Sequence, residues 1–464
     1  MKRIGRYTIC GLLGRGGMGK VYKVSLPTIH KVGALKLLDP DPMLQKMMGL
    51  STLRDRFVNE ACILAGLSHP NIVAIHDFDE ALGKPFYVMN YYPGNLGAMM
   101  GESYRVEARS RKFSVEKALH YTRQTLEGLA CLHHAGIIHR DVKPFNLLVT
   151  AGDGVKLCDF GLSKLRGESF AGPANLNVGS PYYAAPEQET NPDAVAAGTD
   201  LYPVGVMLYR MLTGTLPNLG GRKGKYVAVD RFNPDLDSTW DTLVLQAIAP
   251  DPHKRFADAE TMRRAVDQLA HHFQQRKENQ CALSSAPNPS PEKAPSSTAV
   301  RTHPMKIRPG KARLLFDLDA LWRPTAYTAN RFRPPLRQTI ADNATGLTWQ
   351  QAGSRYPVTW HQAKMQVAQL NDMAFGGRTR WRLPTISELA TLLRPHPQGE
   401  ALCIELLFDE RQRWLWSADR RSFTAAYYVD VQLGFVGWQD FDAPYYVRAV
   451  CTDNPTATGR VSGH

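Results

Sequence analysis

The strongest constraint on what this chain can fold into is a set of short polar motifs that follow one another in a fixed order. The segment 139–146 reads His-Arg-Asp-Val-Lys-Pro-Phe-Asn, and Asp159 begins an Asp-Phe-Gly triplet eighteen positions after Asp141. An Ala-Pro-Glu triplet follows at 185–187. These motifs supply a proton acceptor, oxygen ligands for a metal ion and a lysine, which are the groups that phosphoryl transfer requires. An enzyme is therefore the leading interpretation.

A Gly-rich segment lies upstream of these motifs. Gly14, Gly16 and Gly19 have the spacing that lets the tip of a hairpin fold its backbone N–H groups over phosphates without Cβ clashes. A strand pattern continues through Val21, and an Ala-Leu-Lys triplet follows at 34–36. A Gly-rich hairpin alone is more often a simple turn, but the lysine triplet at the right distance makes the combination specific.

The lysine of that triplet, Lys36, needs a carboxylate partner to hold its flexible stem in place. Glu60 is the candidate, because the helical stretch at residues 56–61 resembles the αC helix of the eukaryotic-like protein kinases, whose glutamate pairs with this lysine. The alternative is a solvated glutamate on the face of that helix.

From Gly14 to Arg255, the sequence resembles the eukaryotic-like (Hanks-type) serine/threonine protein kinases, over a little more than half of the chain. The resemblance implies an α+β bilobal fold, with an N-lobe at residues 1–90 and a C-lobe at residues 91–275. It also implies ATP and Mg²⁺ as cofactors, with transfer of the γ-phosphoryl group to serine or threonine hydroxyls of protein substrates and of the kinase itself. The alternative is an ATP-binding pseudokinase scaffold, which the complete set of motifs disfavours.

The resemblance implies a role for each polar residue of the catalytic segment. Asp141 would accept the proton of the substrate hydroxyl, and Lys143 would neutralise developing charge. Asn146 and Asp159 would hold Mg²⁺ against the phosphates. The Asp-x-Lys pair indicates serine or threonine as the acceptor, by family resemblance.

The nucleotide-binding residues implied by the resemblance extend from the Gly-rich loop into the C-lobe. They are Leu13, Gly14, Gly16, Gly19, Val21, Ala34, Lys36, Met89, Asn90, Tyr92 and Leu148. Met89 would be the gatekeeper, and backbone groups of Asn90 and Tyr92 would bind adenine. The family commonly has an acidic residue where this chain has Asn90. Because backbone groups make the contact, nucleotide binding should survive this departure.

Regulation is expected to act on the activation loop at residues 159–187. Arg140 beside Asp141 indicates an active form that is ordered by an anionic group on this loop. Ser169 is the predicted phosphorylation site. Ser180 replaces the family's usual threonine and would keep the hydroxyl that touches the catalytic loop.

Other C-lobe residues are expected to support the site structurally. Glu187 and Arg255 resemble the family's buried ion pair, and Asp200 resembles the residue that braces the catalytic loop. Pro203 is unusual at its position. We expect it in the first turn of a helix, where its missing N–H loses no intrahelical hydrogen bond.

The composition changes after residue 275. Residues 276–313 are rich in proline, serine and basic residues, which predicts an extended, positively charged linker without a helix or a membrane anchor. The formal charge of the chain is +13, and the excess is concentrated in this short segment rather than in a recognisable nucleic-acid fold. Nucleic acid is therefore disfavoured as a partner.

Residues 314–464 form the second predicted domain, and seven of the eight tryptophans lie there. Capping boxes at Thr359 and Thr385 predict helices at 360–370 and 386–393. Aromatic and β-branched runs predict strands, which we place at 413–417, 425–431, 435–438 and 445–450.

Four segments of this domain carry a second resemblance, over residues 338–453. They are Asp-Asn-Ala-Thr-Gly-Leu-Thr-Trp at 342–349, Thr-Trp-x-x-Ala at 359–363, Trp-Arg-Leu-Pro-Thr-x-x-Glu-Leu at 381–389 and Tyr-Tyr-Val-Arg at 445–448. Together they resemble the C-terminal domain of the Lcl collagen-like adhesins, a C-type-lectin-like family. The resemblance implies a small α+β module that binds a carbohydrate or protein ligand.

The aromatic residues of this module are expected to be mostly core residues. Arg382, Tyr446 and Arg448 are the predicted binding face.

Cysteine usage and hydropathy bear on the compartment. The seven cysteines are scattered without Cys-x-x-Cys pairs, which is typical of free thiols in a reducing compartment. No run of about 18 apolar residues occurs. We therefore expect a cytoplasmic protein without a structural metal.

Overall fold

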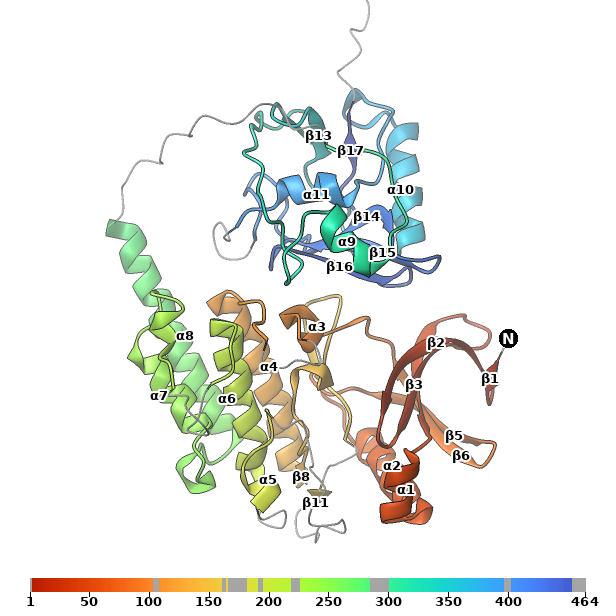
Figure 1. Ribbon diagram of the computed structural model, residues 1–464, viewed down its shortest axis with the longest axis vertical. Coiled ribbons are helices and arrows are strands. Elements are labelled where there is room, and N and C mark those ends of the chain that lie inside the picture. Colours follow the sequence, from red (N-terminus) through yellow and green to blue (C-terminus); the bar gives the residue numbers. More distant parts are fainter. Residues whose placement is uncertain are drawn as a thin grey trace, which may run out of the picture. The chain divides into compact units, whose positions relative to one another are not determined.

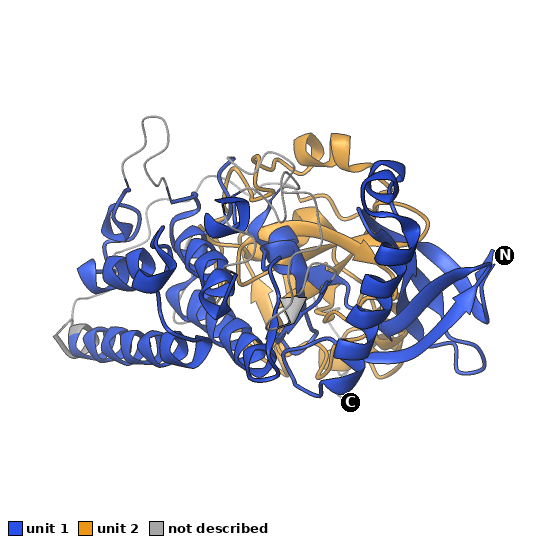
Figure 2. Ribbon diagram, turned by 90° about the horizontal axis from the view of Figure 1, so that it is seen from below, with its two compact units in different colours: residues 1–284 blue, residues 285–464 orange. Residues whose placement is uncertain are grey.

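A computed structural model of the chain divides it into two compact units, residues 1–284 and residues 285–464 (Figure 2). The structure describes residues 2–102, 108–160, 164–165, 182–190, 195–217, 226–283, 300–395 and 402–452.

The N-terminal lobe of unit 1 is an antiparallel sheet with helices α1 and α2 beside it (Figure 1). The strand order is β1-β2-β3-β4-β6-β5. The elements are β1 (Arg3–Ile4), β2 (Tyr7–Gly16), β3 (Gly19–Ser25), β4 (Val32–Leu38), α1 (Pro42–Met48), α2 (Leu50–Gly66), β5 (Ile75–Ala81) and β6 (Lys84–Asn90). Buried side chains from β2, β3, β4 and β6, including Leu35 and Phe86, form the core of this sheet.

The C-terminal lobe of unit 1 is mainly helical, and α4 packs against both α6 and α8 (Figure 1). Its helices are α3 (Leu96–Met100), α4 (Val115–His134), α5 (Glu187–Thr190), α6 (Ala197–Thr213), α7 (Ser238–Ala247) and α8 (Ala259–Leu283), with short 3₁₀ helices η1 (Pro144–Asn146), η3 (Val229–Arg231) and η4 (Pro252–Lys254). Its short strands are β7 (Gly94–Asn95), β8 (Ile137–Ile138), β9 (Leu147–Val149), β10 (Val155–Leu157) and β11 (Lys164–Leu165). The bilobal α+β fold expected from the first resemblance is confirmed.

Pro203 lies inside helix α6 rather than in its first turn, so that prediction is wrong. It is the seventh residue of the helix and is buried. A proline here removes the hydrogen bond to the carbonyl of Thr199 and costs a helix roughly 3 kcal/mol. The helix persists because nearly every residue from Thr199 to Thr213 is buried in the lobe, so tertiary packing outweighs this cost.

Unit 2 is a small α+β domain with two antiparallel sheets, in the orders β12-β13-β17 and β14-β15-β16. Its elements are α9 (Pro309–Leu315), β12 (Thr339–Asp342), β13 (Leu347–Gln350), α10 (Trp360–Asp372), η5 (Phe375–Gly377), α11 (Ile386–Leu392), β14 (Trp414–Arg420), β15 (Ala425–Asp430), β16 (Phe435–Asp440) and β17 (Val450–Cys451). Helix α11 packs on β14 and β15.

The predicted helices of unit 2 are confirmed, and so are their capping boxes. The side chain of Thr359 accepts from the backbone of Gln362, and that of Thr385 accepts from the backbone of Glu388. The predicted strand at 445–450 is wrong as a single element. Its first residues make only isolated bridges, and regular pairing begins at Val450.

The predicted linker is too long at both ends. Helix α8 continues to Leu283. At the other end, Arg301 binds Asp419 through two hydrogen bonds of 2.9 and 2.7 Å, and Ile307 and Ala312 are buried in the core of unit 2. Residues 284–299 lie outside the described residues.

The predicted binding face is wrong for Arg448, which is fully buried. Its guanidinium donates to the backbone oxygen of Gln351 at 2.7 Å and to the side-chain oxygen of Gln412 at 2.8 Å. Arg382 is paired with Glu388, and Tyr446 packs partly buried against the core. These residues support the domain's interior, as do the buried tryptophans Trp349, Trp360, Trp381, Trp414 and Trp416.

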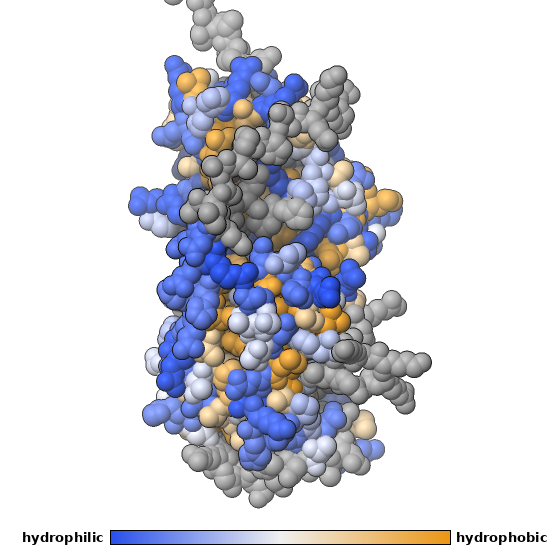
Figure 3. Space-filling view, turned by 90° about the vertical axis from the view of Figure 1, so that its left-hand side faces the viewer, coloured by the Kyte–Doolittle hydropathy of each residue, from blue (hydrophilic) through white to orange (hydrophobic). Residues whose placement is uncertain are grey.

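Polar side chains surround smaller groups of apolar ones on the face of the molecule shown in Figure 3. Among the helices of the described ranges, none combines the length and the hydrophobicity that a membrane crossing needs.

Substitution of Gly19 by alanine tests the packing of the β2–β3 hairpin on β4. A Cβ at this position would lie 2.1 Å from the backbone oxygen of Leu37, which cannot move without breaking the sheet. We expect Gly19→Ala to lower the free energy of unfolding of unit 1 by about 1–3 kcal/mol, measured by urea denaturation.

The matched control is Gly11→Ala, because a Cβ on Gly11 meets nothing within 4 Å. Equal unfolding free energies for the two variants would contradict the steric argument.

Candidate active site

The Gly-rich hairpin presents open backbone at two of its glycines and tight packing at the third. A Cβ on Gly14 or Gly16 would meet no atom within 4 Å, whereas one on Gly19 would clash with β4. Leu13 is exposed and Val21 is half-buried on the same hairpin. The first two glycines therefore leave space for a ligand to approach the backbone, and the third closes the hairpin onto the sheet.

Lys36 on β4 and Glu60 on α2 form the predicted pair. The Lys36 ammonium lies 2.7 and 3.0 Å from the two carboxylate oxygens of Glu60, and both side chains are buried. Glu60 also accepts hydrogen bonds from the hydroxyl of Tyr87 at 2.9 Å and the backbone N–H of Phe160 at 3.0 Å. The carboxylate is thus held by three elements of the fold, and it is not a solvated helix-face glutamate.

Asp159 is the second carboxylate on Lys36, with its Oδ1 atom 2.8 Å from the ammonium. Burial opposes a charged lysine, but Asp159 and Glu60 outweigh it and raise the pKa of Lys36 well above its ordinary value. Lys36 in turn lowers the pKa of Asp159 to about 2. Both groups are therefore ionised at neutral pH.

The catalytic segment folds so that Asp141 is contacted by both of its predicted neighbours. The Lys143 ammonium lies 2.6 Å from Oδ2 of Asp141, and the amide nitrogen of Asn146 donates to the same oxygen at 3.0 Å. Asn146 also donates to the backbone oxygen of Asp141 at 2.8 Å. Burial raises the pKa of Asp141, although Lys143 opposes the shift. A carboxylate with a raised pKa is a better proton acceptor than an ordinary aspartate.

Asp200, at the start of α6, holds the backbone of this segment. Its carboxylate accepts hydrogen bonds from the backbone N–H groups of His139 at 2.9 Å and Arg140 at 2.8 Å, and it lies 2.9 Å from the imidazole of His133. Arg140 has a φ of 67°, a left-handed conformation that is unfavourable for a residue with a side chain. The predicted bracing contact is therefore present, and it stabilises a strained backbone.

The residues expected around adenine come together from separate strands. Ala34 on β4 is paired in register with Met89 on β6, and both are buried. Asn90 follows Met89 at the end of β6 and accepts a hydrogen bond from Lys31 at 3.1 Å. Leu148 lies on β9 in the C-terminal lobe and is half-buried.

The donor groups of Asn146 and Asp159 fit a hard divalent cation. The amide nitrogen of Asn146 donates to Asp141, and the side-chain oxygen of Asn146 takes no part in these hydrogen bonds. The Asp159 side chain is 46% exposed and ionised. An amide oxygen and a carboxylate are ligands that Mg²⁺ accepts, usually together with water and phosphate oxygens.

The predicted pair of Glu187 and Arg255 is present and buried. Two parallel contacts of 2.7 Å join the carboxylate to the guanidinium. Arg255 also donates to the backbone oxygens of Ala249 at 2.7 Å and Gly198 at 3.0 Å, and Thr199 donates to Glu187. This pair joins α5, α6 and the segment before α8 into one body.

Part of the expected site lies outside the described residues. Ser169, Ser180 and Gly161 of the Asp-Phe-Gly triplet all fall there.

Two contributors were missed by the reasoning from sequence, Tyr87 and Gln188. Tyr87 binds Glu60, and Gln188 donates to the backbone oxygen of Arg140 at 2.8 Å. The sequence indicates Tyr87 only weakly: it lies two residues before Met89 on the predicted strand, so the two side chains are expected on the same face of the sheet. Gln188 directly follows the Ala-Pro-Glu triplet, but nothing in the local sequence indicates its distant partner.

Comparison with protein families gives two matches. Residues 7–272 match the family described as "Protein kinase domain", and residues 338–451 match the family described as "Lcl C-terminal domain".

Curated relatives are similar to the first unit. A probable serine/threonine-protein kinase of Streptomyces coelicolor is 32% identical over 274 residues, covering 56% of this chain and 39% of that protein. Serine/threonine-protein kinase PksC of the same species is 33% identical over 58% of this chain and 50% of its own length. PknJ of Mycobacterium tuberculosis is 33% identical over 54% of this chain and 43% of its own length. The chain thus spans half or less of the length of these relatives.

Replacement of Arg255 tests how much the Glu187–Arg255 pair contributes to the stability of unit 1. Arg255→Met leaves a buried carboxylate without its cation, which typically costs about 3–5 kcal/mol. We expect the free energy of unfolding of unit 1 to fall by this amount, so its unfolding midpoint should move to a lower urea concentration. Intrinsic fluorescence measures the transition.

The control is Arg263→Met, because Arg263 pairs with Glu260 and Asp267 near the surface of α8. Its loss should cost less than about 1 kcal/mol. A loss for Arg255→Met no larger than that of the control would refute the assigned role.

Proposed function

The chain belongs to the protein kinase family, and from this premise we propose that it transfers the γ-phosphoryl group of ATP to serine or threonine hydroxyls of proteins. The observation that carries the proposal is the joint geometry of two clusters of charged and polar side chains. Lys36 is fixed between Glu60 and Asp159, and Asp141 is contacted by Lys143 and Asn146. The serine/threonine specificity rests on the similarity to curated serine/threonine kinases and on the Asp-x-Lys pair.

Lys36 is proposed to bind the phosphates of ATP. Its ammonium is already oriented by Glu60, so little side-chain freedom is lost when the nucleotide arrives. The open backbone at Gly14 and Gly16 is proposed to lie over the same phosphates. Leu13, Val21, Ala34, Met89 and Leu148 are proposed to enclose the base, with the backbone of Asn90 and Tyr92 as its hydrogen-bonding partners.

Asp141 is proposed to take the proton of the substrate hydroxyl and to orient its oxygen. Lys143, 2.6 Å from Asp141, is proposed to offset negative charge that develops during transfer. Asn146 and Asp159 are the proposed ligands of Mg²⁺, which would supply positive charge against the negative charge of the phosphates. Asp200 acts indirectly, because it holds the backbone on which Asp141 is carried.

Unit 2 is proposed to be a binding module for a carbohydrate or protein ligand. The support is the match of residues 338–451 to the Lcl C-terminal domain family and the compact α+β fold. The kinase and the module are proposed to act together in signalling, and Ser169 is proposed to be a phosphorylation site that regulates the kinase.

Replacement of the proposed base tests the enzymatic proposal. We expect Asp141→Asn to lower phosphate transfer from labelled ATP by about 10²–10⁴-fold, the usual contribution of a general base. Nucleotide affinity, measured by fluorescence titration, should change little. Phosphoamino-acid analysis of the wild-type product should show phosphoserine or phosphothreonine, and mass spectrometry shows whether Ser169 carries phosphate.

The matched control is Asp235→Asn, because Asp235 is an exposed aspartate of the C-terminal lobe. It should retain full transfer. An equally active Asp141→Asn variant would contradict the proposal, and ATP binding without any transfer would favour the pseudokinase scaffold.

The dependence of the rate on pH provides a separate test. Asp141 must be ionised to accept a proton, and burial raises its pKa. The rate at saturating ATP should therefore fall as the pH drops, with a midpoint above the ordinary aspartate pKa of about 4. In Lys143→Met the residual rate should fall at a still higher pH, because the cation that favours the ionised form is lost. An acid limb at the same pH in both proteins would contradict this role of Lys143.

A further inference from the structure

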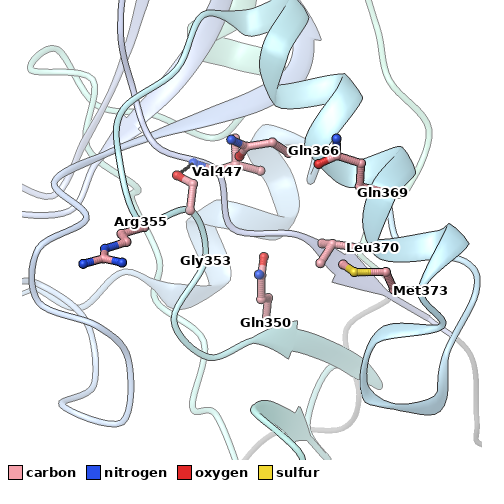
Figure 4. A pocket seen from close by; sticks show the side chains of 9 residues that line it. Gln350, Gly353, Arg355, Gln366, Gln369, Leu370, Met373 and Val447 are labelled. Carbon is pink, nitrogen blue, oxygen red and sulfur yellow. Dashed lines mark hydrogen bonds between the residues drawn. The ribbon is translucent and has the colours of Figure 1, made fainter.

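A pocket of about 220 Å³ lies within unit 2, between helix α10 and the loop that follows β13 (Figure 4). Side chains from both elements and from the segment at Val447 line it. None of Arg382, Tyr446 and Arg448, the face predicted from the sequence, lines this pocket, although Val447 lies between the last two in the chain.

Three glutamine side chains give the pocket its polar character. Gln366 and Gln369 come from successive turns of α10, and Gln350 comes from the end of β13 on the opposite side (Figure 4). Within the described part of the chain, the amides of Gln366 and Gln369 make no hydrogen bond. Gln350 accepts one long contact, 3.4 Å from the backbone N–H of Ala449. Hydrogen-bonding capacity thus remains on both sides of the pocket.

The wall of the pocket opposite α10 is preformed. Gly353 has a φ of 64°, and a Cβ there would lie 2.2 Å from Gln412 and 2.4 Å from the oxygen of Val447. The Gln412 amide donates to the backbone oxygen of Ser354 at 2.8 Å, and the Ser354 hydroxyl accepts from the N–H of Val447 at 3.0 Å. Buried Arg448 holds the other end of Gln412 at 2.8 Å. This wall is already ordered before a ligand binds, so binding loses little free energy to ordering it.

The chemistry of the lining selects the class of ligand. Carboxamides are uncharged and offer both a donor and an acceptor, which matches hydroxyl groups that also do both. No aspartate or glutamate lines the pocket, so nothing there favours a cation. Leu370, Met373 and Val447 add an apolar surface that suits the C–H face of a ring.

An extended peptide fits this site less well. Peptides commonly bind by adding a strand to a free sheet edge. Strand β13, which carries Gln350, is already paired with β12 on one side and β17 on the other. The pocket is also compact, and it is smaller than the roughly 300–1,000 Å³ of typical drug-sized sites.

We propose that this pocket binds a small, uncharged polyhydroxylated ligand of about one monosaccharide unit, through the amides of Gln350, Gln366 and Gln369. The inference rests on the proposed role of unit 2 as a binding module and not on phosphoryl transfer. Arg355 stands at the mouth with its guanidinium directed away from the centre (Figure 4). It leaves the interior neutral.

The test is a titration of the full chain, measured by isothermal calorimetry. The sugars are D-glucose, D-galactose, D-mannose and N-acetyl-D-glucosamine. Triglycine is the peptide probe. We expect saturable binding of at least one sugar and none of triglycine. The double variant Gln366→Leu/Gln369→Leu should weaken that binding at least about tenfold, since it removes two hydrogen-bonding groups.

The matched control is Ala368→Leu, which adds the same side chain to an exposed position of α10 that does not line the pocket. It should bind the sugar as the wild type does. Lack of saturation with every sugar, undiminished affinity in the double variant, or binding of triglycine in place of the sugars would each overturn the proposal.

Two readouts separate this proposal from the enzymatic one. Asp141→Asn should leave sugar binding unchanged, and the double glutamine variant should still transfer phosphate. Loss of sugar binding in Asp141→Asn would contradict the independence of the pocket.

Discussion

The three-way contact of Lys36 with Glu60 and Asp159 is the interaction on which the geometry of the kinase unit depends. Each group comes from a different part of the fold: strand β4, helix α2 and the segment after β10. Separately, a buried lysine or a buried glutamate would be costly. Together they are compensated, and the ammonium reaches its partners only when α2 and the segment at Asp159 are both in place. The contact therefore ties the N-terminal lobe to the C-terminal lobe.

A second constraint acts on the backbone of the catalytic segment. Arg140 and Asp159 both adopt left-handed conformations with a φ of 67°, which an ordinary residue adopts only when its surroundings compensate. Asp200 supplies two of the compensating hydrogen bonds, and α6 carries Asp200. Tertiary packing keeps α6 helical despite Pro203. The long, buried helix of the C-terminal lobe is thus part of the support of Asp141, although it carries no group that reacts.

Much of the fold and of the candidate site could be predicted from local sequence. The pairing of Lys36 with Glu60 was predicted from the resemblance to the kinase family. The capping boxes of α10 and α11 follow from short local patterns. The errors have a common origin in long-range burial. Arg448 looked like a surface residue, but it is buried inside unit 2, where it donates hydrogen bonds to Gln412 and to backbone oxygens. The basic segment at 300–313 looked like a linker, but Asp419 binds Arg301 and the domain core takes in Ile307.

The sequence by itself determined the identity and order of the chemical groups: the glycines of the hairpin, Lys36, Asp141, Asn146 and Asp159. Glycine spacing, caps and reactive side chains act over a few residues, so a linear pattern can express them. The tertiary structure alone decided which charged side chains are buried and which groups pair with them. It also placed Gln350 opposite Gln366 and Gln369. Burial and the meeting of distant residues depend on how elements pack, and that information is spread over the whole chain rather than written at any one position.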